Sequence, residues 1–257
     1  MIQEFIREFS RLPQVNAIAL GGSRAGTHFD SASDYDIYIY CSEPIPEETR
    51  RKYLGPLSRY VEYSNHFWEL EDNGTFLNGI DFDILYRNLD DFTAGVASVV
   101  EGHNCQNAYT TCMWHNLITC KVLYDPSGAL EAAKRRFLVP YPQQLRENIL
   151  HNGWRLLRTS MPAYETQIIK AAKRGDLVSV NHRISAFLET YFDVLFAANS
   201  QTHPGEKRLI PLCLELCPLL PDKFEENLNA LFSHMYTAPE CIPGDLSAIL
   251  LELEKII

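Results

Sequence analysis

Three aspartates in the first third of this 257-residue chain have the spacing of a metal-binding acidic site. Asp34 and Asp36 belong to the stretch SDYDIYIY, whose alternation predicts a strand with both carboxylates on one face. Asp83 belongs to a second alternating run, GIDFDILYR. Carboxylates gathered on a sheet face repel one another and are costly to bury. Mg²⁺ removes both costs and prefers oxygen ligands, so we expect these aspartates to hold one or two Mg²⁺ ions.

A Gly-Gly-Ser turn, formed by Gly21, Gly22 and Ser23, precedes the first of these aspartates and follows a short apolar run. Glycine lets the backbone approach a phosphate closely, and Ser23 would open a short helix whose free N–H groups face an anion. Next to an Asp-x-Asp pair, this turn predicts a site for a nucleoside triphosphate. Two Mg²⁺ ions there would stabilise the attacking and leaving oxygens of an in-line displacement.

The charge of the chain limits the partners that can be expected. The formal net charge is −10, and the sequence contains no basic run or tail. A protein that binds nucleic acid needs positive charge against the phosphates, so the composition argues against a nucleic-acid partner. Small phosphates remain compatible with an acidic chain, because bound Mg²⁺ supplies positive charge locally.

The cysteines and the apolar runs predict where the protein works. The seven cysteines include no Cys-x-x-Cys pair, and we expect reduced thiols in a cytoplasmic protein. The N-terminal segment MIQEFIREFSRL lacks the apolar core of a signal peptide. No run approaches the ~18 apolar residues of a membrane span, so we expect no contact with a membrane.

The first half of the chain alternates short apolar runs with amphipathic segments, which predicts a mixed sheet with flanking helices. We expect strands at 15–20, 34–40, 63–70, 75–87 and 121–124. We expect helices at 2–11, at 23–28, from 46 to about 60, from about 91 and at 109–118. Asn73-Gly74 predicts a hairpin between the third and fourth strands, and Asp90 is expected to cap the helix that starts near Asp91.

The second half shows helical periodicity and no convincing strand. We expect helices at 128–137, 142–158, 162–174, 177–198, 222–234 and 245–256. The tripeptide Arg-Gly-Asp at 174–176 is interpreted as a helix–helix turn with Asp176 as the N-cap. The predicted class is therefore α/β (α+β), a mixed sheet with flanking helices followed by an all-helical C-terminal domain. The boundary is placed between Pro126 and Pro140, giving domains 1–126 and 127–257.

Taken together, these motifs resemble the DNA polymerase beta-like nucleotidyltransferase superfamily. GGSRAG and SDYDIYIY are similar to its small bacterial members, which include antibiotic nucleotidyltransferases. FDILYRNL resembles the strand that carries the third carboxylate in those proteins, and VLYDPSG resembles the last strand of their catalytic domain. LFAANSQTHPGEKRL is similar to a segment of their helical domain. The likeness is specific in the sheet half and loose in the helical half.

The resemblance implies a reaction and a set of phosphate-binding residues. A nucleoside monophosphate would pass from a nucleoside triphosphate, with ATP as the expected donor, to a hydroxyl of a small acceptor, releasing pyrophosphate. Gly22 and Ser23 would bind the triphosphate. Arg24 and, from the helical half, Lys207 would contact its phosphates. Residues 1–126 would form the catalytic domain, and residues 127–257 the helical domain for substrate and nucleotide.

The resemblance also assigns the carboxylates. Asp34 and Asp36 would ligate both Mg²⁺ ions, and Asp83 would ligate the catalytic ion and help to deprotonate the acceptor. Asp81 lies on the same expected strand face as Asp83, so either aspartate could be the third ligand, and the following ILYR favours Asp83. A separate general base could come from the helical half, at Glu165 or Glu189.

Two other functions use the same motifs. A toxin-like or regulatory nucleotidyltransferase would modify tRNA or a protein, and a basic surface around 135–136 and 155–158 would favour the RNA target. A non-catalytic nucleotide-binding protein would keep the fold without the transfer, and the intact aspartates argue against it. Because the chain is acidic, we expect a small cationic acceptor, such as an aminoglycoside, rather than an RNA.

Overall fold

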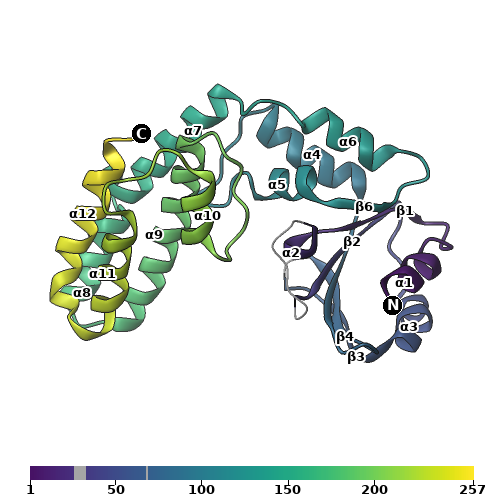
Figure 1. Ribbon diagram of the computed structural model, residues 1–257. Coiled ribbons are helices and arrows are strands. Elements are labelled where there is room, and N and C mark those ends of the chain that lie inside the picture. Colours follow the sequence, from purple (N-terminus) through teal and green to yellow (C-terminus); the bar gives the residue numbers. More distant parts are fainter. Residues whose placement is uncertain (26–32, 68) are drawn as a thin grey trace. The chain divides into compact units, whose positions relative to one another are not determined.

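The protein is described by a computed structural model that covers residues 1–25, 33–67 and 69–257, without the side chain of Ser23. It divides into two compact units. The sheet unit consists of Met1–Ala97 and Asn116–Val139, and the helical unit consists of Ser98–His115 and Pro140–Ile257. The predicted class, a mixed sheet with helices followed by a helical part, is confirmed (Figure 1).

The compact units do not divide at a single point of the chain. Two of the divisions fall inside helices, α4 (Leu89–Val100) and α5 (Cys112–Thr119), and the third falls between Val139 and Pro140. Helix α6 (Ala129–Phe137) was assigned to the second domain by its periodicity, yet it lies in the sheet unit and contacts its sheet. Periodicity identifies a helix but not the unit against which that helix packs.

Six strands of the described residues form one sheet in the order β3-β4-β5-β2-β1-β6. Their bounds are β1 Val15–Leu20, β2 Tyr35–Cys41, β3 Ser58–Asn65, β4 Leu70–Phe76, β5 Asp81–Arg87 and β6 Lys121–Tyr124. The pair β2–β5 is parallel, whereas the other four pairs are antiparallel. The sheet is therefore mixed, with its one parallel pairing at the centre.

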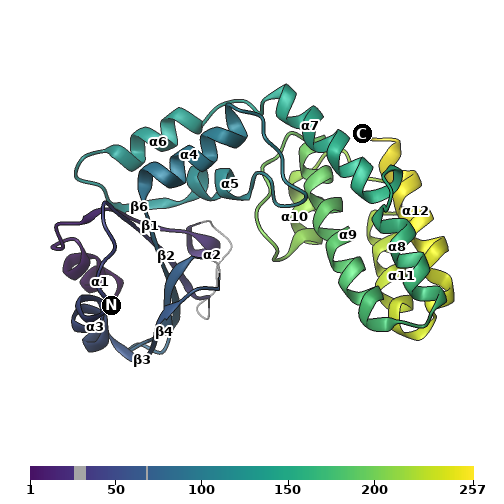
Figure 2. The same ribbon diagram turned by 180° about the vertical axis from the view of Figure 1, so that it is seen from behind.

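One face of the sheet forms the apolar core of this unit. Helices α1 (Ile2–Phe9) and α3 (Glu47–Leu54) cover it, as both views show (Figures 1 and 2). The strands contribute Ile37 and Ile39 from β2 and Ile84 from β5, all fully buried. Because side chains alternate between faces, Asp36 and Asp83 point to the opposite face, as the sequence predicted.

The predicted hairpin at Asn73-Gly74 is wrong, since both residues lie within β4. The β4–β5 turn uses the second Asn-Gly pair, Asn78-Gly79, where Gly79 has φ +83 and its N–H donates to the carbonyl of Phe76 at 2.8 Å. Gly74 is needed for another reason. A Cβ there would lie 2.3 Å from the carbonyl oxygen of the neighbouring strand β3. The run predicted as one strand, 75–87, is thus two strands and a turn.

Two helix boundaries also differ from the prediction. The helix expected to reach about residue 60 ends at Leu54, where a short 3₁₀ turn with Pro56 leads directly into β3. Asn88, rather than Asp90, caps α4, because its Oδ1 accepts the N–H groups of Asp90 and Asp91 at 2.9 and 3.0 Å. Asp90 lies two residues past this N-cap, within the first turn of α4, where its own N–H is one of those that Asn88 accepts.

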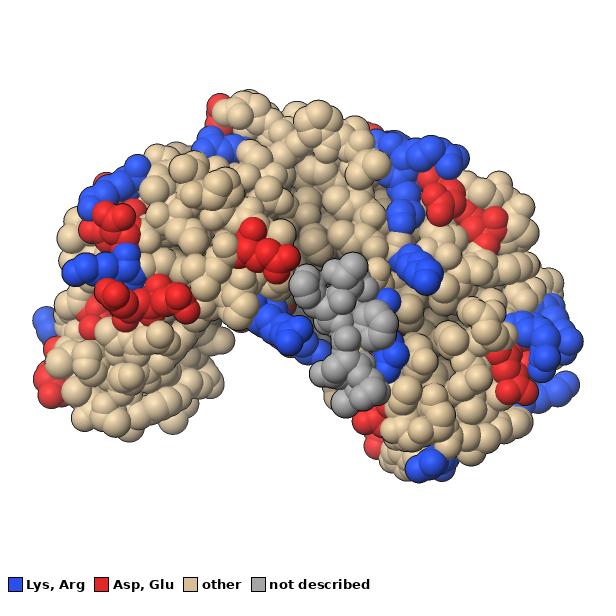
Figure 3. All heavy atoms as spheres, viewed as in Figure 1, with Lys and Arg blue, Asp and Glu red and all other residues tan. Residues whose placement is uncertain are grey.

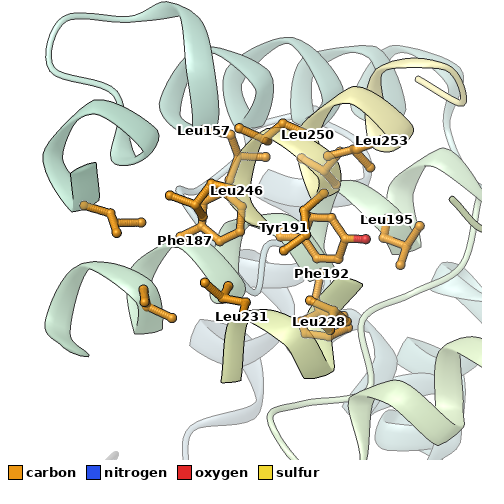
Figure 4. Packing of buried hydrophobic residues seen from close by; sticks show 14 of the residues in the cluster. Leu157, Phe187, Tyr191, Phe192, Leu195, Leu228, Leu231, Leu246, Leu250 and Leu253 are labelled. Carbon is orange, nitrogen blue, oxygen red and sulfur yellow. The ribbon is translucent and has the colours of Figure 1, made fainter. Parts of the chain in front are cut away.

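The helical unit is organised around one long buried helix, α9, whose predicted bounds, Leu177–Ala198, are confirmed. The helices that follow α6 are α7 Gln143–Trp154, α8 Tyr164–Lys173, α9 Leu177–Ala198, α10 Leu209–Leu216, α11 Phe224–Thr237 and α12 Ile242–Glu254. Figure 4 shows how Phe187 and Tyr191 of α9 lie among leucines of the neighbouring elements. Among the described residues, no helix combines the length and apolar character that a membrane crossing requires.

The start of α9 follows from its sequence, whereas helix α10 does not. Asp176 is the N-cap that the sequence predicted, since its carboxylate accepts the N–H of Ser179 at 3.1 Å. Helix α10 was not predicted, because its sequence, LIPLCLEL, is apolar on most sides and contains Pro211. Pro211 lies in the first turn of α10, where its missing N–H has no helical partner to lose.

A buried ion pair joins α3 to β4 on the apolar side of the sheet. The guanidinium of Arg50 pairs with the carboxylate of Asp72, and the two side chains are 3% and 0% exposed. Asp72 also accepts the N–H of Ser64 and the hydroxyl of Tyr86, each at 2.9 Å. The Asp72 charge is therefore satisfied at both oxygens, and removing Arg50 would leave it buried without its countercharge.

A second buried polar cluster lies in the helical unit. His203 is fully buried, with its ring edge-on to Tyr109 at 4.9 Å between centroids. Its Nδ1 accepts the N–H of Gly205 at 3.1 Å, which places the ring proton on Nε2. Burial lowers the pKa of His203 to about 4. Nearby on α9, burial raises the pKa of Asp193 to about 6, although Thr110 donates to both of its oxygens.

Arg50→Met should lower the free energy of unfolding by about 3–5 kcal/mol, because it leaves the buried Asp72 carboxylate without its countercharge. The matched control is Arg51→Met on the next residue, which removes a pair to Glu47 whose arginine is 55% exposed and should leave stability almost unchanged. Urea unfolding at neutral pH measures both variants. Equal losses in the two variants would contradict the structural importance of the buried pair.

The free energy of unfolding should depend on pH because His203 is buried in its neutral form. Its pKa is about 4 in the folded chain and 6.5 ordinarily, so its stabilisation is complete above pH 6.5 and is lost as pH falls toward 4. The wild-type chain should lose about 3 kcal/mol over that interval relative to His203→Asn. Asn is chosen because its Oδ1 can still accept the Gly205 N–H.

Asp193 should change the free energy of unfolding with pH in the opposite direction, and Asp193→Asn tests this. The pKa of Asp193 is raised from 3.8 to about 6, so its contribution is complete below pH 3.8 and is lost as pH rises through 6. Relative to wild type, this variant should therefore gain stability as pH rises. The free energy of unfolding of wild type and both variants is measured between pH 4 and 7. The same pH dependence in all three proteins would refute both pKa assignments.

Candidate functional site

The parallel pairing of β2 with β5 sets two carboxylates side by side. Asp36 is the register partner of Asp83, as its neighbour Ile37 is of Ile84. Neighbouring strands lie about 4.8 Å apart, and both aspartates point away from the apolar core. Both are half-buried. Two half-buried carboxylates at this separation repel each other in the absence of a cation.

The glycine turn after β1 lies directly against this pair. The N–H of Gly21 donates to the carbonyl of Asp36 at 2.7 Å. Gly22 has φ +57, and a Cβ there would lie 1.8 Å from Oδ2 of Asp36. A Cβ on Gly21 would lie 2.2 Å from the ring of Tyr38. Both glycines are therefore needed for the close approach of this backbone to the β2 side chains.

The short helix α2 (Gly22–Ala25) begins at the second glycine of the turn. The side chain of Ser23 and residues 26–32 lie outside the described residues, so the expected role of the Ser23 side chain stays a prediction. Arg24 ties α2 to the start of β2. Its Nε–H donates to the carbonyl of Ser33 at 2.6 Å, and its guanidinium lies 4.3 Å from the centroid of the Tyr35 ring. Phosphate contact by Arg24 stays a prediction.

The other two candidate aspartates, Asp34 and Asp81, are more exposed. Asp34 is exposed and precedes β2, and Asp81 is exposed and accepts the hydroxyl of Thr75 at 2.5 Å. Within the described ranges, no three His, Cys, Asp or Glu side chains form a metal-ligand group. The structure thus brings together Asp36 and Asp83. Metal ligation by Asp34 stays a prediction.

Two polar residues beside Asp83 were not singled out from the sequence. Asn73 of β4 is the register partner of Asp83, and its Nδ2 donates to Asp83 Oδ1 at 2.7 Å. Glu71, two residues earlier on the same strand, is only 3% exposed and accepts the N–H of Phe67 at 2.9 Å. The available signal was the alternation of Glu71 and Asn73, which the turn interpretation of EDNG concealed.

Beyond Asp36, the same face is closed by an aromatic and cationic layer. The buried guanidinium of Arg87 lies 4.4 Å from the centroid of the Tyr38 ring and 4.9 Å from that of Phe92. Asn116 donates to the hydroxyl oxygen of Tyr38 at 2.6 Å, and burial raises the pKa of that phenol. Tyr38 is therefore a fixed, neutral surface against which Gly21 packs.

The helical-half candidates are described within their own unit. Lys207 is exposed in the segment that precedes α10. Glu165 faces the guanidinium of Arg158 at 3.8 Å, and Glu189 is half-buried on α9. The roles expected for these three residues stay predictions.

The described carboxylates fit an Mg²⁺ ion by the chemistry of the donor set. Mg²⁺ in nucleotide sites is held by one or two carboxylates, with substrate phosphates and waters completing its octahedral shell. Asp36 and Asp83 supply two carboxylates on adjacent strands. A Cβ at Gly22 would collide with the Asp36 carboxylate, so glycine is the residue that lets the turn backbone lie against this ligand.

Comparisons with known proteins give a match to one protein family and to several solved structures. Residues 109–209 match a domain of unknown function, DUF4037. Comparison of the sequence with characterised proteins gives no match. A nucleotidyltransferase-like protein from Exiguobacterium sibiricum 255-15 aligns in structure with a TM-score of 0.44 and 10% identity, over 99% of this chain and 72% of that one.

Two adenyltransferases align over similar lengths. An aminoglycoside 6-adenyltransferase from Bacillus subtilis gives a TM-score of 0.28 and 9% identity, over 98% of this chain and 89% of that one. The spectinomycin adenyltransferase AAD(9) from Enterococcus faecialis, solved with ATP and spectinomycin, gives 0.29 and 14% identity, over 98% and 99% of the two chains.

Gly22→Ala tests the close approach of the turn. Gly22 and Gly128 have similar φ, +57 and +71, but only the Cβ at Gly22 meets another group. Both substitutions carry the strain of a left-handed alanine, roughly 1 kcal/mol. Gly22→Ala should cost at least about 1 kcal/mol more in thermal unfolding, because it also displaces Asp36. Equal losses for the two variants would contradict the contact between the turn and the carboxylate.

Proposed function

We propose that this chain is an Mg²⁺-dependent nucleotidyltransferase. It transfers a nucleoside monophosphate, AMP from ATP in the simplest case, to a hydroxyl of a small acceptor and releases pyrophosphate. The observation that carries the proposal is the register of β2 and β5, which sets Asp36 beside Asp83 with the Gly21-Gly22 turn in contact with the same strand. The sheet unit acts as the catalytic domain, and the helical unit as the domain for substrate and nucleotide.

The residues have separate tasks in the proposed reaction. Gly22 and Ser23 bind the triphosphate through their backbone, while Arg24 and Lys207 contact its phosphates. Asp34, Asp36 and Asp83 hold Mg²⁺, which when bound supplies positive charge to the phosphate oxygens. The acceptor oxygen bonds to the α-phosphorus as the bond to the bridging oxygen breaks and pyrophosphate leaves. The hydroxyl proton passes to a carboxylate oxygen of Asp83.

A small, cationic acceptor suits the charge of the chain better than an RNA. The net charge is −10, and a basic groove is what RNA binding requires. On the face in Figure 3, Lys and Arg lie interspersed with Asp and Glu among uncharged residues. Arg158, part of the basic surface that an RNA target would use, faces Glu165 and Glu254 at 3.8 Å each. The free thiols fit work in the reducing cytoplasm.

Asp36→Asn should lower the rate of transfer at least about 100-fold, because it removes a carboxylate that holds the metal. Stability should stay unchanged or rise, since one of two adjacent like charges is lost. The measurement is pyrophosphate release from each of the four NTPs with Mg²⁺, against aminoglycosides, lincosamides and bulk tRNA. Asp81→Asn, on the same strand face as Asp83 but exposed, is the matched control and should keep its activity.

The panel separates the alternatives. Release with a small acceptor that disappears in Asp36→Asn supports the proposal, and release with tRNA alone would replace the small acceptor by an RNA. Unchanged turnover in Asp36→Asn would contradict the metal assignment. Loss of activity in Asp81→Asn but not in Asp83→Asn would move the third carboxylate to Asp81.

A further inference from the structure

The side-chain amide of Asn73 uses all of its hydrogen-bonding groups. Its Nδ2 donates to Asp83 Oδ1 at 2.7 Å and to Glu71 Oε2 at 3.3 Å. Its Oδ1 accepts from Nδ2 of Asn65 at 2.8 Å. An amide offers two N–H donors and one carbonyl, so each has a partner here. Asn73 is therefore held from three sides at the centre of a polar cluster on β3, β4 and β5.

The orientation of this amide is fixed by the chemistry of its neighbours. Ionised Asp83 and Glu71 only accept hydrogen bonds, whereas the Asn65 amide nitrogen only donates. Turning the Asn73 amide over would face its carbonyl toward two carboxylates and its NH₂ toward another NH₂. Glu71 is itself fixed by the N–H of Phe67 at 2.9 Å and is 3% exposed. The cluster therefore presents an N–H group to Asp83 at a fixed position.

We propose that Asn73 is the positioning residue of Asp83, an inference that rests on the proposed nucleotidyltransferase function. Its N–H binds Oδ1, stops rotation of the carboxylate and leaves Oδ2 directed to the metal and the acceptor hydroxyl. A charged acceptor gains more from such a bond than a neutral one does. Partners that orient a metal-binding carboxylate typically contribute 10- to 100-fold to metal affinity or activity.

Few other residues can do this at position 73. A serine hydroxyl could reach Asp83, as the Thr75 hydroxyl reaches Asp81, but its single hydrogen cannot also be donated to Glu71. An aspartate would add a third carboxylate beside Asp83 and Glu71, which like-charge repulsion opposes. An amide of this length, with two donors, satisfies two carboxylates at once. The residue that the sequence suggested as a turn is thus the one whose side chain matches the needs of the site.

The same two strands provide a matched control. Thr75 faces Asp81 in the next pair on this face of the β4–β5 ladder, and its hydroxyl donates to Asp81 Oδ1 at 2.5 Å. Thr75→Ala therefore removes the same kind of cross-strand bond to an aspartate, on the same face, without touching Asp83. Asn73→Ala and Asn73→Val both remove the bond to Asp83, so that the result does not depend on the stability of one variant.

Three readouts are measured for these variants and for Asp83→Asn: thermal unfolding, Mn²⁺ binding by electron paramagnetic resonance with a non-hydrolysable ATP analogue, and kcat and KM for pyrophosphate release. Asn73→Ala and Asn73→Val should weaken the more weakly bound Mn²⁺ about tenfold or more and lower kcat about as much. KM for the NTP should stay within about twofold, because Gly22 and Asp36 are unchanged. Thr75→Ala should match wild type in Mn²⁺ affinity and kcat.

The positioning role of Asn73 and the proposed function of the chain can be refuted separately. If Asp83→Asn abolishes transfer while both Asn73 variants behave like Thr75→Ala, the positioning role of Asn73 is refuted and the proposed function stands. If Asp83→Asn leaves Mn²⁺ binding and kcat unchanged, the proposed function fails at Asp83, and the positioning role fails with it.

Discussion

The parallel pairing of β2 with β5 is the constraint on which the rest of the sheet unit depends. Parallel strands cannot be joined by a tight turn, so the chain between them must cross over. Here the crossover contains α3, β3 and β4, and its last strand returns to the sheet beside β5. That path places Asp36 opposite Asp83 and, from the other side, Asn73 next to Asp83. A shift of one residue in either register would move a carboxylate to the apolar face.

Placing two carboxylates side by side has a cost that the surrounding residues reduce. The Asn73 amide donates to the Asp83 carboxylate, while the Gly21 N–H binds the backbone carbonyl of Asp36 and holds the turn beside β2. At both glycines a Cβ would collide with a β2 side chain, Tyr38 at Gly21 and Asp36 at Gly22. The other face packs the apolar core, and the buried charges there, Arg50 and Asp72, neutralise each other. This separation suits a sheet whose polar face binds a cation and a phosphate.

Local patterns in the sequence predicted the parts of this arrangement that depend on local physics. Alternation placed Asp36 and Asp83 away from the core, and the bounds of β1, β6 and α9 agree with the structure. The sequence could not decide which Asn-Gly pair turns, because the answer depends on how β4 pairs with both of its neighbours. For the same reason Asn73 was interpreted as a turn residue and its contact with Asp83 was missed. The unit to which α6 belongs likewise depends on packing rather than on periodicity.

The most direct test of the central claim is a crystal structure with Mn²⁺ and a non-hydrolysable ATP analogue, using the anomalous signal of manganese. The account predicts a manganese peak within about 2.3 Å of one carboxylate oxygen from Asp36 and one from Asp83, with analogue phosphates completing the shell. The Gly21-Gly22 backbone should lie against those phosphates. A nucleotide bound with its metal away from both aspartates, or no manganese between β2 and β5, would contradict it.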